Sequence, residues 1–194
     1  MFELENIENN WTLFLDRDGV LNEEKPASYV FHYGEFHFLP GVLESLRQLA
    51  RIFKTIVLVT NQKGIGKGLM SENDLSLIHD EMLKEIKQAG GRIDAIYFCP
   101  ALEDLHEDRK PNPGMAFRAQ KDLEGIDFKR SVMVGNKLSD MQFGKNAGMY
   151  TVHVRTTNPD IPFPHPLIDL SCKDLPDFTS MLIDAKPQLL NPRQ

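Results

Sequence analysis

Phe14-Leu15-Asp16-Arg17-Asp18-Gly19-Val20-Leu21 carries the strongest structural signal in this 194-residue chain. An apolar run ends there in two carboxylates one residue apart, followed by a glycine. Side chains at i and i+2 of an extended chain point to the same face, so we expect Asp16 and Asp18 to lie side by side, with Arg17 turned the other way. Adjacent carboxylates repel each other unless a cation or a shared proton is present. This pattern is typical of a carboxylate nucleophile paired with a carboxylic acid and organised by a divalent metal.

Length and composition favour one globular domain. The chain is 41% hydrophobic and 26% charged, with a formal net charge of −6. This charge argues against a nucleic-acid-binding protein, but a few local cations in a cleft still allow a phosphorylated substrate. Cys99 and Cys172 are too few for a disulfide scaffold and fit a reducing compartment. No secretory signal and no membrane-length apolar run occur, so we expect a cytoplasmic protein without membrane or nucleic-acid partners.

Short apolar segments alternate with helical patterns along the chain. Helices are predicted near 42–49, 71–90, 115–123 and 139–147. The nearly continuous apolar character of the predicted strands is typical of a parallel sheet covered on both faces. This alternation predicts a doubly wound α/β fold, with a mainly parallel sheet and helices on both faces. The five predicted strands are residues 12–15, 55–59, 95–98, 131–134 and 150–154.

Two segments interrupt the alternation, and we assign both to one domain of residues 1–194. Residues 22–38 are rich in aromatic residues and histidine, so we expect an insert over the carboxyl edge of the sheet, with room for a small hairpin. Residues 155–194 begin with several prolines, which predicts an extended strap. A short helix containing Leu175 and Phe178 should follow, with a frayed end from about Pro187.

Polar clusters follow the predicted strands. Asp16 and Asp18 come after the first strand, and Asn136 and Asp140 come after the fourth. In an open α/β sheet, ligands bind outside the carboxyl ends of the strands. The sequence therefore predicts that these residues converge on one site, together with Thr60-Asn61-Gln62 after the second strand and Arg109-Lys110-Pro111 after the third.

Each cluster also has a purely structural interpretation. Asp-x-Asp-Gly is a common strand exit, Thr60-Asn61 is consistent with a helix or turn cap, and Asp140 with a first-turn acid favoured by the helix dipole. Lys110 is consistent with a solvated loop charge. The glycines around Lys67 match neither common phosphate-loop motif, so we interpret that segment as a flexible loop on the substrate side. Four coincidences at one sheet edge are harder to explain than one active site.

From about Phe14 to Val154 the chain resembles the haloacid dehalogenase (HAD) superfamily of phosphohydrolases. The resemblance implies a HAD-like, Rossmann-type fold with no large cap domain. Within the superfamily, the longer strings are similar to those of heptose bisphosphate phosphatases, whose nearest relatives are histidinol-phosphate phosphatases. The residues that carry the resemblance are Asp16-x-Asp18-Gly19-Val20, Val59-Thr60-Asn61-Gln62-x-Gly64-Ile65, Arg109-Lys110-Pro111-x-Pro113-Gly114-Met115 and Gly135-Asn136-Lys137-Leu138-x-Asp140.

The resemblance also implies roles for individual residues. Asp16 would attack phosphorus and become an aspartyl phosphate, while Asp18 would protonate the leaving oxygen and then activate water. Thr60 and Lys110 would bind the transferring phosphoryl group. Mg²⁺ would be held by Asp16, the backbone carbonyl of Asp18, and residues of the last motif. Those residues are Asn136 and Asp140, and substrate contacts are expected from Asn61, Gln62, Lys63, Lys67, Arg109, Lys137 and the 22–38 insert.

Two positions depart from the family pattern. Residue 136 is asparagine where the family usually has aspartate, so we expect an active enzyme with a raised magnesium requirement; the alternative is a non-catalytic phosphosugar-binding relative. The family's structural zinc is usually held by Cys-Pro-His and a later Cys-x-Cys. Here these elements are Cys99-Pro100-Ala101 and His106-Glu107-Asp108. A closed site needs four ligands, so we predict that no zinc is bound.

The implied activity is the Mg²⁺-dependent hydrolysis of a phosphomonoester by a monomeric enzyme. The preferred substrate is D-glycero-D-manno-heptose 1,7-bisphosphate, losing its C7 phosphate on the route to nucleotide-activated heptose for lipopolysaccharide. Histidinol phosphate or another small phosphosugar is the alternative. The string Gly64-Ile65 and the string Pro113-Gly114-Met115 favour the heptose substrate.

Overall fold

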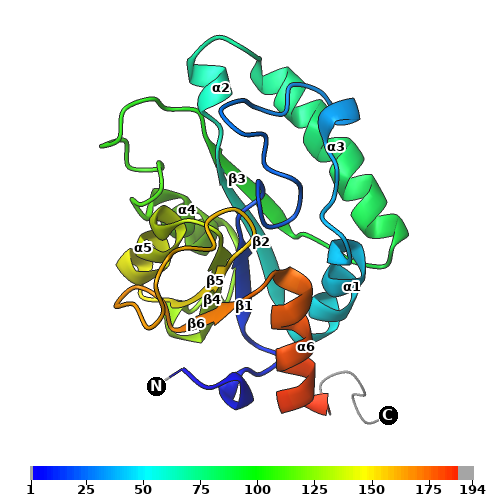
Figure 1. Cartoon of the computed structure of the whole chain (residues 1–194), viewed down its shortest axis with the longest axis vertical. Coiled ribbons are helices and arrows are strands. Elements are labelled where there is room, and N and C mark those ends of the chain that lie inside the picture. The colour runs from blue at the N-terminus through cyan, green and yellow to red at the C-terminus, as the bar shows by residue number, and fades with distance from the viewer. Residues whose placement is uncertain (1, 188–194) are drawn as a thin grey trace.

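The computed structural model describes residues 2–187, so the frayed end predicted from about Pro187 lies, beyond that residue, outside the described residues. One six-stranded sheet runs through this part of the chain in the order β3-β2-β1-β4-β5-β6, and every neighbouring pair of strands is parallel (Figure 1). The strands are β1 (Thr12–Leu15), β2 (Thr55–Asn61), β3 (Ala95–Cys99), β4 (Ser131–Gly135), β5 (Tyr150–Val154) and β6 (Leu170–Cys172).

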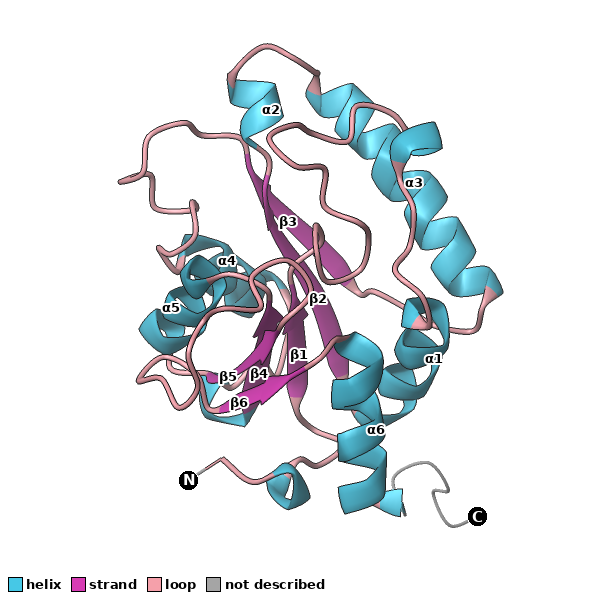
Figure 2. Cartoon of the chain, in the orientation of Figure 1, coloured by secondary structure: helices cyan, strands magenta, loops and turns pink. Residues whose placement is uncertain are grey.

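Helices connect these strands and cover both faces of the sheet (Figure 2). They are α1 (Val42–Ile52), α2 (Lys63–Gly66), α3 (Glu72–Gln88), α4 (Gly114–Asp122), α5 (Leu138–Ala147) and α6 (Leu175–Ala185), with short 3₁₀ turns η1 (Leu4–Asn6), η2 (Tyr33–Glu35) and η3 (Phe128–Arg130).

Alternation along each strand divides the apolar residues between two cores. Leu13 of β1 lies opposite Ile56 and Val132 in the register and belongs to the core formed with α1, α3 and α6. Its neighbour Phe14 points to the other face and packs with residues of α4 and α5. Because both faces are buried, the strands need no polar face, as the sequence indicated. The predicted α/β fold is confirmed.

Helix ends follow local sequence signals. Ser71 caps α3 with a capping box, in which its hydroxyl accepts from the backbone of Asp74 and its backbone donates to the Asp74 carboxylate. Asp174 caps α6 with its side chain alone, which accepts from the backbone N–H of Asp177. At the other end of a helix, Gly148 closes α5 with φ of 88°, a left-handed conformation that glycine adopts without strain.

Three segments differ from their expected structure. The proline-rich strap contains β6, which pairs with β5 and was not predicted because only Cys172 of this three-residue strand is fully buried. The loop expected around Lys67 begins with the short helix α2. The 22–38 insert holds η2 and a single antiparallel bridge between Asn22 and Phe38 rather than a hairpin. Within residues 2–187, no helix combines the length and the apolar character needed to cross a bilayer.

Candidate active site

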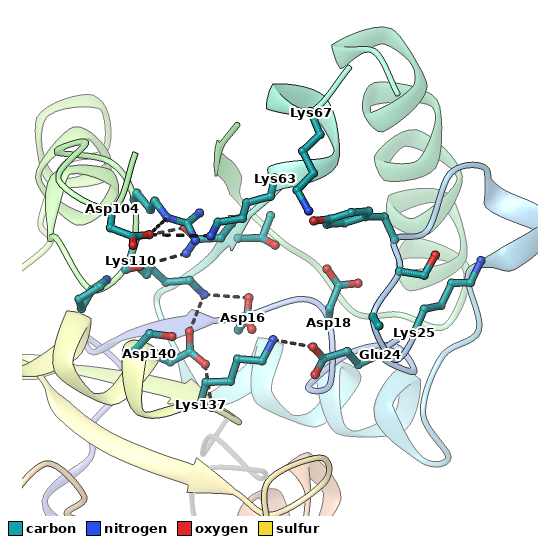
Figure 3. A pocket seen from close by; sticks show the side chains of 18 residues that line it. Asp16, Asp18, Glu24, Lys25, Lys63, Lys67, Asp104, Lys110, Lys137 and Asp140 are labelled. Atoms are coloured by element: carbon teal, nitrogen blue, oxygen red, sulfur yellow. Dashed lines mark hydrogen bonds and ion pairs between the residues drawn. The ribbon is translucent and has the colours of Figure 1, made fainter. Parts of the chain in front are cut away.

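A cavity of about 680 Å³ opens at the carboxyl edge of the sheet (Figure 3). Its walls come from the ends of β1 and β2, the 22–38 insert, the loop before α4 and the start of α5. Strand order reverses between β1 and β4, so this edge is the topological switch point where open α/β sheets bind ligands. The cavity brings together these residues predicted from sequence: Asp16, Asp18, Thr60, Asn61, Lys63, Arg109, Lys110, Lys137 and Asp140.

Lys110 lies at the centre of a buried ion-pair network. Its Nζ is 2.8 Å from Oδ1 of Asp16 and 2.7 Å from Oδ1 of Asp140, and it donates to the carbonyl of Val59 at 2.9 Å. Burial alone would lower the pKa of Lys110, but the carboxylates of Asp140 and Asp16 outweigh it and raise the pKa. Lys110 is therefore a fixed cation beside Asp16.

The backbone of Lys110 is held by a side chain from β2. Asn61 accepts from the N–H of Lys110 at 3.0 Å and donates to its carbonyl at 3.1 Å. This reciprocal pair fixes the loop against the end of the sheet. The side chain of Asn61 therefore positions Lys110. The predicted substrate contact of this residue was its backbone N–H, and Asn61 does line the cavity.

Asp140 has both carboxylate oxygens engaged within the protein. Oδ1 pairs with Lys110, and Oδ2 accepts from the N–H of Lys137 at 3.0 Å at the start of α5. A Cβ on Gly135 would lie 2.3 Å from Cβ of Asp140, so only glycine permits this approach. With these contacts, Asp140 orients Lys110. The resemblance had implied that Asp140 is also a metal ligand.

Asp18 has three partners around its carboxylate. Arg17 Nη2 lies 3.0 Å from both oxygens, Asn22 donates to Oδ1 at 3.0 Å and Gln62 donates to Oδ2 at 3.1 Å. Burial would raise the pKa of Asp18, but Arg17 and these hydrogen bonds lower it below its usual value. The expectation that Arg17 turns away is wrong for its end group, because the long side chain bends back, fully buried, with Nη1 3.3 Å from Nε2 of His79.

Asp16 differs from Asp18 in its electrostatics. Burial raises the pKa of Asp16 to about 6, and the attraction of Lys110 only partly offsets this. Its backbone N–H donates to the carbonyl of Val134, which ties the end of β1 to β4. The two carboxylates therefore sit close in sequence but in different environments, with Asp18 stabilised as an anion more strongly than Asp16.

Asn136 is fully buried directly after β4. Its Nδ2 donates to Oε2 of Glu24 at 3.1 Å and to the Thr157 hydroxyl at 2.5 Å, whereas its Oδ1 has no hydrogen-bond partner among residues 2–187. A buried carbonyl oxygen without a partner is costly unless a ligand uses it. Amide and carboxylate oxygens are suitable Mg²⁺ ligands. Asp16 lines the cavity, whereas the predicted ligand Asn136 is fully buried and is not among the lining residues. The donor types of these two residues fit a magnesium ion at this edge.

Several cations surround the outer part of the cavity (Figure 3). Lys63 and Lys67 reach in from the start of α2 and the residue after it. Lys63 Nζ is 3.8 Å from Oδ1 of Asp104, and Lys67 lies over the ring of Tyr29. Arg109 is fixed by the same aspartate, with Nε 3.1 Å from Oδ1. This part of the cavity therefore carries excess positive charge.

Gln62 and the insert differ from their predicted contributions. Gln62 does not line the cavity; it lies behind it, where Nε2 bridges Thr60 and Asp18. The insert contributes Glu24 and Lys25, which the sequence analysis did not single out. Both residues are charged and lie in a segment predicted to cover the site, which could have indicated a role there. Charged loop residues are too common, however, for these two to be singled out from the sequence.

The residues in place of the family's zinc ligands contact other protein groups. Cys99 Sγ is 3.7 Å from Nδ1 of His106, but Asp108 is used by Arg118, whose Nη1 lies 2.9 Å from Oδ2. Among the described residues, no three His, Cys, Asp or Glu side chains gather as a closed zinc site would require. The loop is instead held by hydrogen bonds, with Asn112 donating to the carbonyls of Asp104 and His106.

Comparison with known proteins identifies the family. A HAD-hydrolase-like family model matches residues 107–161. The D-glycero-alpha-D-manno-heptose-1,7-bisphosphate 7-phosphatase of Campylobacter jejuni is 41% identical over 140 residues, which cover 72% of this chain and 79% of the relative. The chain belongs to the heptose-bisphosphate phosphatase family of HAD-like hydrolases. The corresponding enzyme of Pasteurella multocida, named for the beta anomer, is 40% identical over 155 residues, which cover 76% of this chain and 83% of that relative.

A solved structure supports this assignment to the heptose-bisphosphate phosphatase family. The D,D-heptose 1.7-bisphosphate phosphatase from B. bronchiseptica, complexed with magnesium and phosphate, superposes with a TM-score of 0.81 at 33% identity. The match covers 90% of this chain and 98% of that chain. The fold of this chain is therefore the fold of a solved heptose-bisphosphate phosphatase.

Proposed function

We propose that this chain is a Mg²⁺-dependent phosphatase that removes the C7 phosphate of D-glycero-D-manno-heptose 1,7-bisphosphate. The observation that carries this proposal is the pairing of Asp16 with Lys110 at 2.8 Å on the wall of a cavity that carries excess positive charge. A fixed cation beside a carboxylate can bind the incoming phosphoryl group and stabilise charge as it transfers.

In the proposed reaction, an Asp16 carboxylate oxygen forms a bond to phosphorus while the bond from phosphorus to the sugar oxygen breaks. Asp18 supplies a proton to that leaving oxygen and later accepts one from the water that hydrolyses the aspartyl phosphate. The partners of Asp18 hold it ionised in the free protein, but an arriving phosphate is a like charge and raises its pKa. Thr60 and Lys110 bind the phosphoryl oxygens.

Magnesium fits this donor set. Asp16, the Asp18 backbone carbonyl and Oδ1 of Asn136 would hold the ion, and it would supply positive charge to the phosphoryl oxygens. Asn136 adds no negative charge where the family usually has aspartate, so a raised magnesium requirement remains our prediction. The absence of zinc, a monomeric state and a cytoplasmic location also remain predictions.

The outer cations favour a bisphosphate over histidinol phosphate. Lys63, Lys67 and Arg109 line the cavity, and among its lining residues on this outer side Asp104 is the balancing carboxylate. Lys25 also lines the cavity, but its ammonium pairs with Glu35 at 2.9 Å. A second phosphate is attracted by this charge, whereas the ammonium group of histidinol phosphate is repelled. We therefore assign these cations to the distal phosphate or the sugar.

The test is a phosphate-release assay on purified protein with both anomers of the heptose bisphosphate and with histidinol phosphate, each with magnesium and with chelator. We expect release of the C7 phosphate that stops in Asp16→Asn and in chelator. Faster turnover of histidinol phosphate would reassign the substrate. No release from any of the three above the Asp16→Asn background would favour the non-catalytic binding alternative that Asn136 raised.

A further inference from the structure

Glu24 connects the 22–38 insert to the two residues that follow β4. Its Oε2 accepts from Nδ2 of Asn136 at 3.1 Å, and its Oε1 lies 2.5 Å from Nζ of Lys137. The carboxylate is three-quarters buried, and Figure 3 shows it beside Asp18 with Lys137 reaching toward it. Each Glu24 oxygen thus has its own partner.

These contacts determine which end of the Asn136 amide faces Glu24. An amide can rotate to present either oxygen or nitrogen, and the choice is set by its partners. A carboxylate only accepts hydrogen bonds, so the side facing Glu24 must be the amino group. The second proton of Nδ2 goes to the Thr157 hydroxyl, which itself receives a hydrogen bond from Asn158. Oδ1 is thereby left without a hydrogen-bond partner among residues 2–187.

The same geometry explains why asparagine suits position 136 in this chain. An aspartate there would place a second carboxylate near 3.1 Å from Oε2 of Glu24, and like charges at that distance in a buried site repel strongly. The sequence alone suggested that Asn136→Asp would improve magnesium binding. With Glu24 in place, the added charge is offset by repulsion within the protein.

We propose that Glu24 is a positioning residue for the metal site: it orients Asn136 so that the amide presents oxygen to the cation, and Glu24 and Asn136 act as a matched pair. The proposal rests on the proposed function in one respect, namely that Asn136 is a metal ligand. Hydrogen-bond partners of metal ligands fix the orientation of those ligands, and their loss typically weakens metal binding about 10- to 100-fold.

The test is a double-mutant cycle of wild type, Glu24→Gln, Asn136→Asp and the double variant. In Glu24→Gln the new amide turns its oxygen to the Lys137 ammonium and its Nε2 to residue 136. Asn136 must then accept through Oδ1 and present its amino group to the metal. In the double variant the same Nε2 donates to a carboxylate, so the pair is matched again with its polarity reversed.

The probe is Mn²⁺, titrated calorimetrically into the metal-free full chain without substrate. We expect Glu24→Gln to weaken binding about tenfold or more in the wild-type background and to strengthen it about tenfold or more in the Asn136→Asp background. Glu23→Gln removes the same charge from the exposed neighbouring residue and should change the affinity less than twofold. Melting curves of all five metal-free proteins identify any variant that fails to fold. If Glu24→Gln fails to fold, Glu24→Asp replaces it in both backgrounds. We then expect weaker Mn²⁺ binding in the wild-type background and no rescue of binding in the Asn136→Asp background.

An effect of Glu24→Gln that has equal size and sign in both backgrounds would overturn the proposal, and so would the absence of Mn²⁺ binding to the wild type. Where Glu24→Asp is the variant used, unchanged affinity in the wild-type background or rescue in the Asn136→Asp background would overturn it. Because no substrate is present, the result is independent of turnover. A protein that shows the reversal of sign but releases no phosphate would refute the proposed function and leave the pairing of Glu24 with Asn136 established.

Discussion

The ammonium nitrogen of Lys110 lies 2.8 Å from Oδ1 of Asp16, and both side chains are almost fully buried. The same nitrogen is 2.7 Å from Asp140, so one cation balances two carboxylates from β1 and α5. In this arrangement the residue that neutralises the site also holds together two elements that are far apart in sequence, so catalysis and stability share one residue.

Lys110→Met should therefore destabilise the fold as well as abolish activity. Removing the cation leaves Asp16 and Asp140 buried without their counter-charge, and breaking a buried pair in this way costs about 3 kcal/mol or more. Urea unfolding at pH 7.5 measures the loss. Lys121→Met, at an exposed position on α4, should change the free energy of unfolding by less than about 0.5 kcal/mol; equal stability of both variants would contradict the network's role.

Asp16→Asn should lower turnover at least about a thousandfold, because an amide does not replace a carboxylate nucleophile. The substitution keeps the side-chain shape, so circular dichroism should show an unchanged fold. Asp184→Asn, at an exposed position on α6, is the matched control with unchanged turnover. Turnover of Asp16→Asn within tenfold of the wild type would exclude Asp16 as the nucleophile.

Lys63→Met tests the assignment of the outer cations. We expect KM for the heptose bisphosphate to rise about tenfold, because a charge-assisted contact to the distal phosphate is lost. With para-nitrophenyl phosphate, which has no second phosphate, KM should change less than twofold. Lys87→Met, at an exposed position on α3, should change KM for neither substrate. An equal rise in KM for both substrates would instead place Lys63 at the transferring phosphate.

His79 should make stability depend on pH. Burial and the neighbouring Arg17 lower its pKa to about 3, so the folded protein keeps His79 neutral while the unfolded chain protonates it near pH 6.5. Stability attributable to His79 is therefore present above pH 6.5 and is lost as pH falls toward 3, at up to about 1.4 kcal/mol per pH unit. Between pH 7 and pH 5, the free energy of unfolding of the wild type should fall about 2 kcal/mol more than that of His79→Gln. Comparison with this variant cancels the opposite contribution of Asp16, whose pKa is raised.

Elemental analysis of purified protein should find no stoichiometric zinc. Cys99 and His106 are neighbours, but the carboxylate of Asp108 pairs with Arg118 and a closed tetrahedral site needs four ligands. We also expect the melting temperature to be unaffected by a zinc-selective chelator. One zinc per chain, together with a chelator-induced loss of stability, would show that this loop recruits ligands beyond these residues.

The sequence was sufficient to predict β1 to β5 of the sheet, though not β6, and the edge at which the candidate site lies. Continuous apolar runs such as Ile56–Val59 specify strands buried on both faces, and parallel strands place their carboxyl ends at one edge. Asp16, Thr60 and Lys110 could therefore be brought together from their order along the chain. Local patterns predict the strands and their order, because apolar character and its periodicity can be read from neighbouring residues in the sequence.

The partners of the site residues depend on long-range contacts that no local pattern encodes. Arg17 bends back to Asp18, Gln62 lies behind the cavity, and Glu24 meets Asn136 across 112 positions of sequence. Each of these follows from where side chains end after the elements have packed, and long polar side chains reach several ångströms from their backbone. The amide at position 136 was visible in the sequence, whereas its hydrogen bond to the Glu24 carboxylate depends on how the fold places the 22–38 insert.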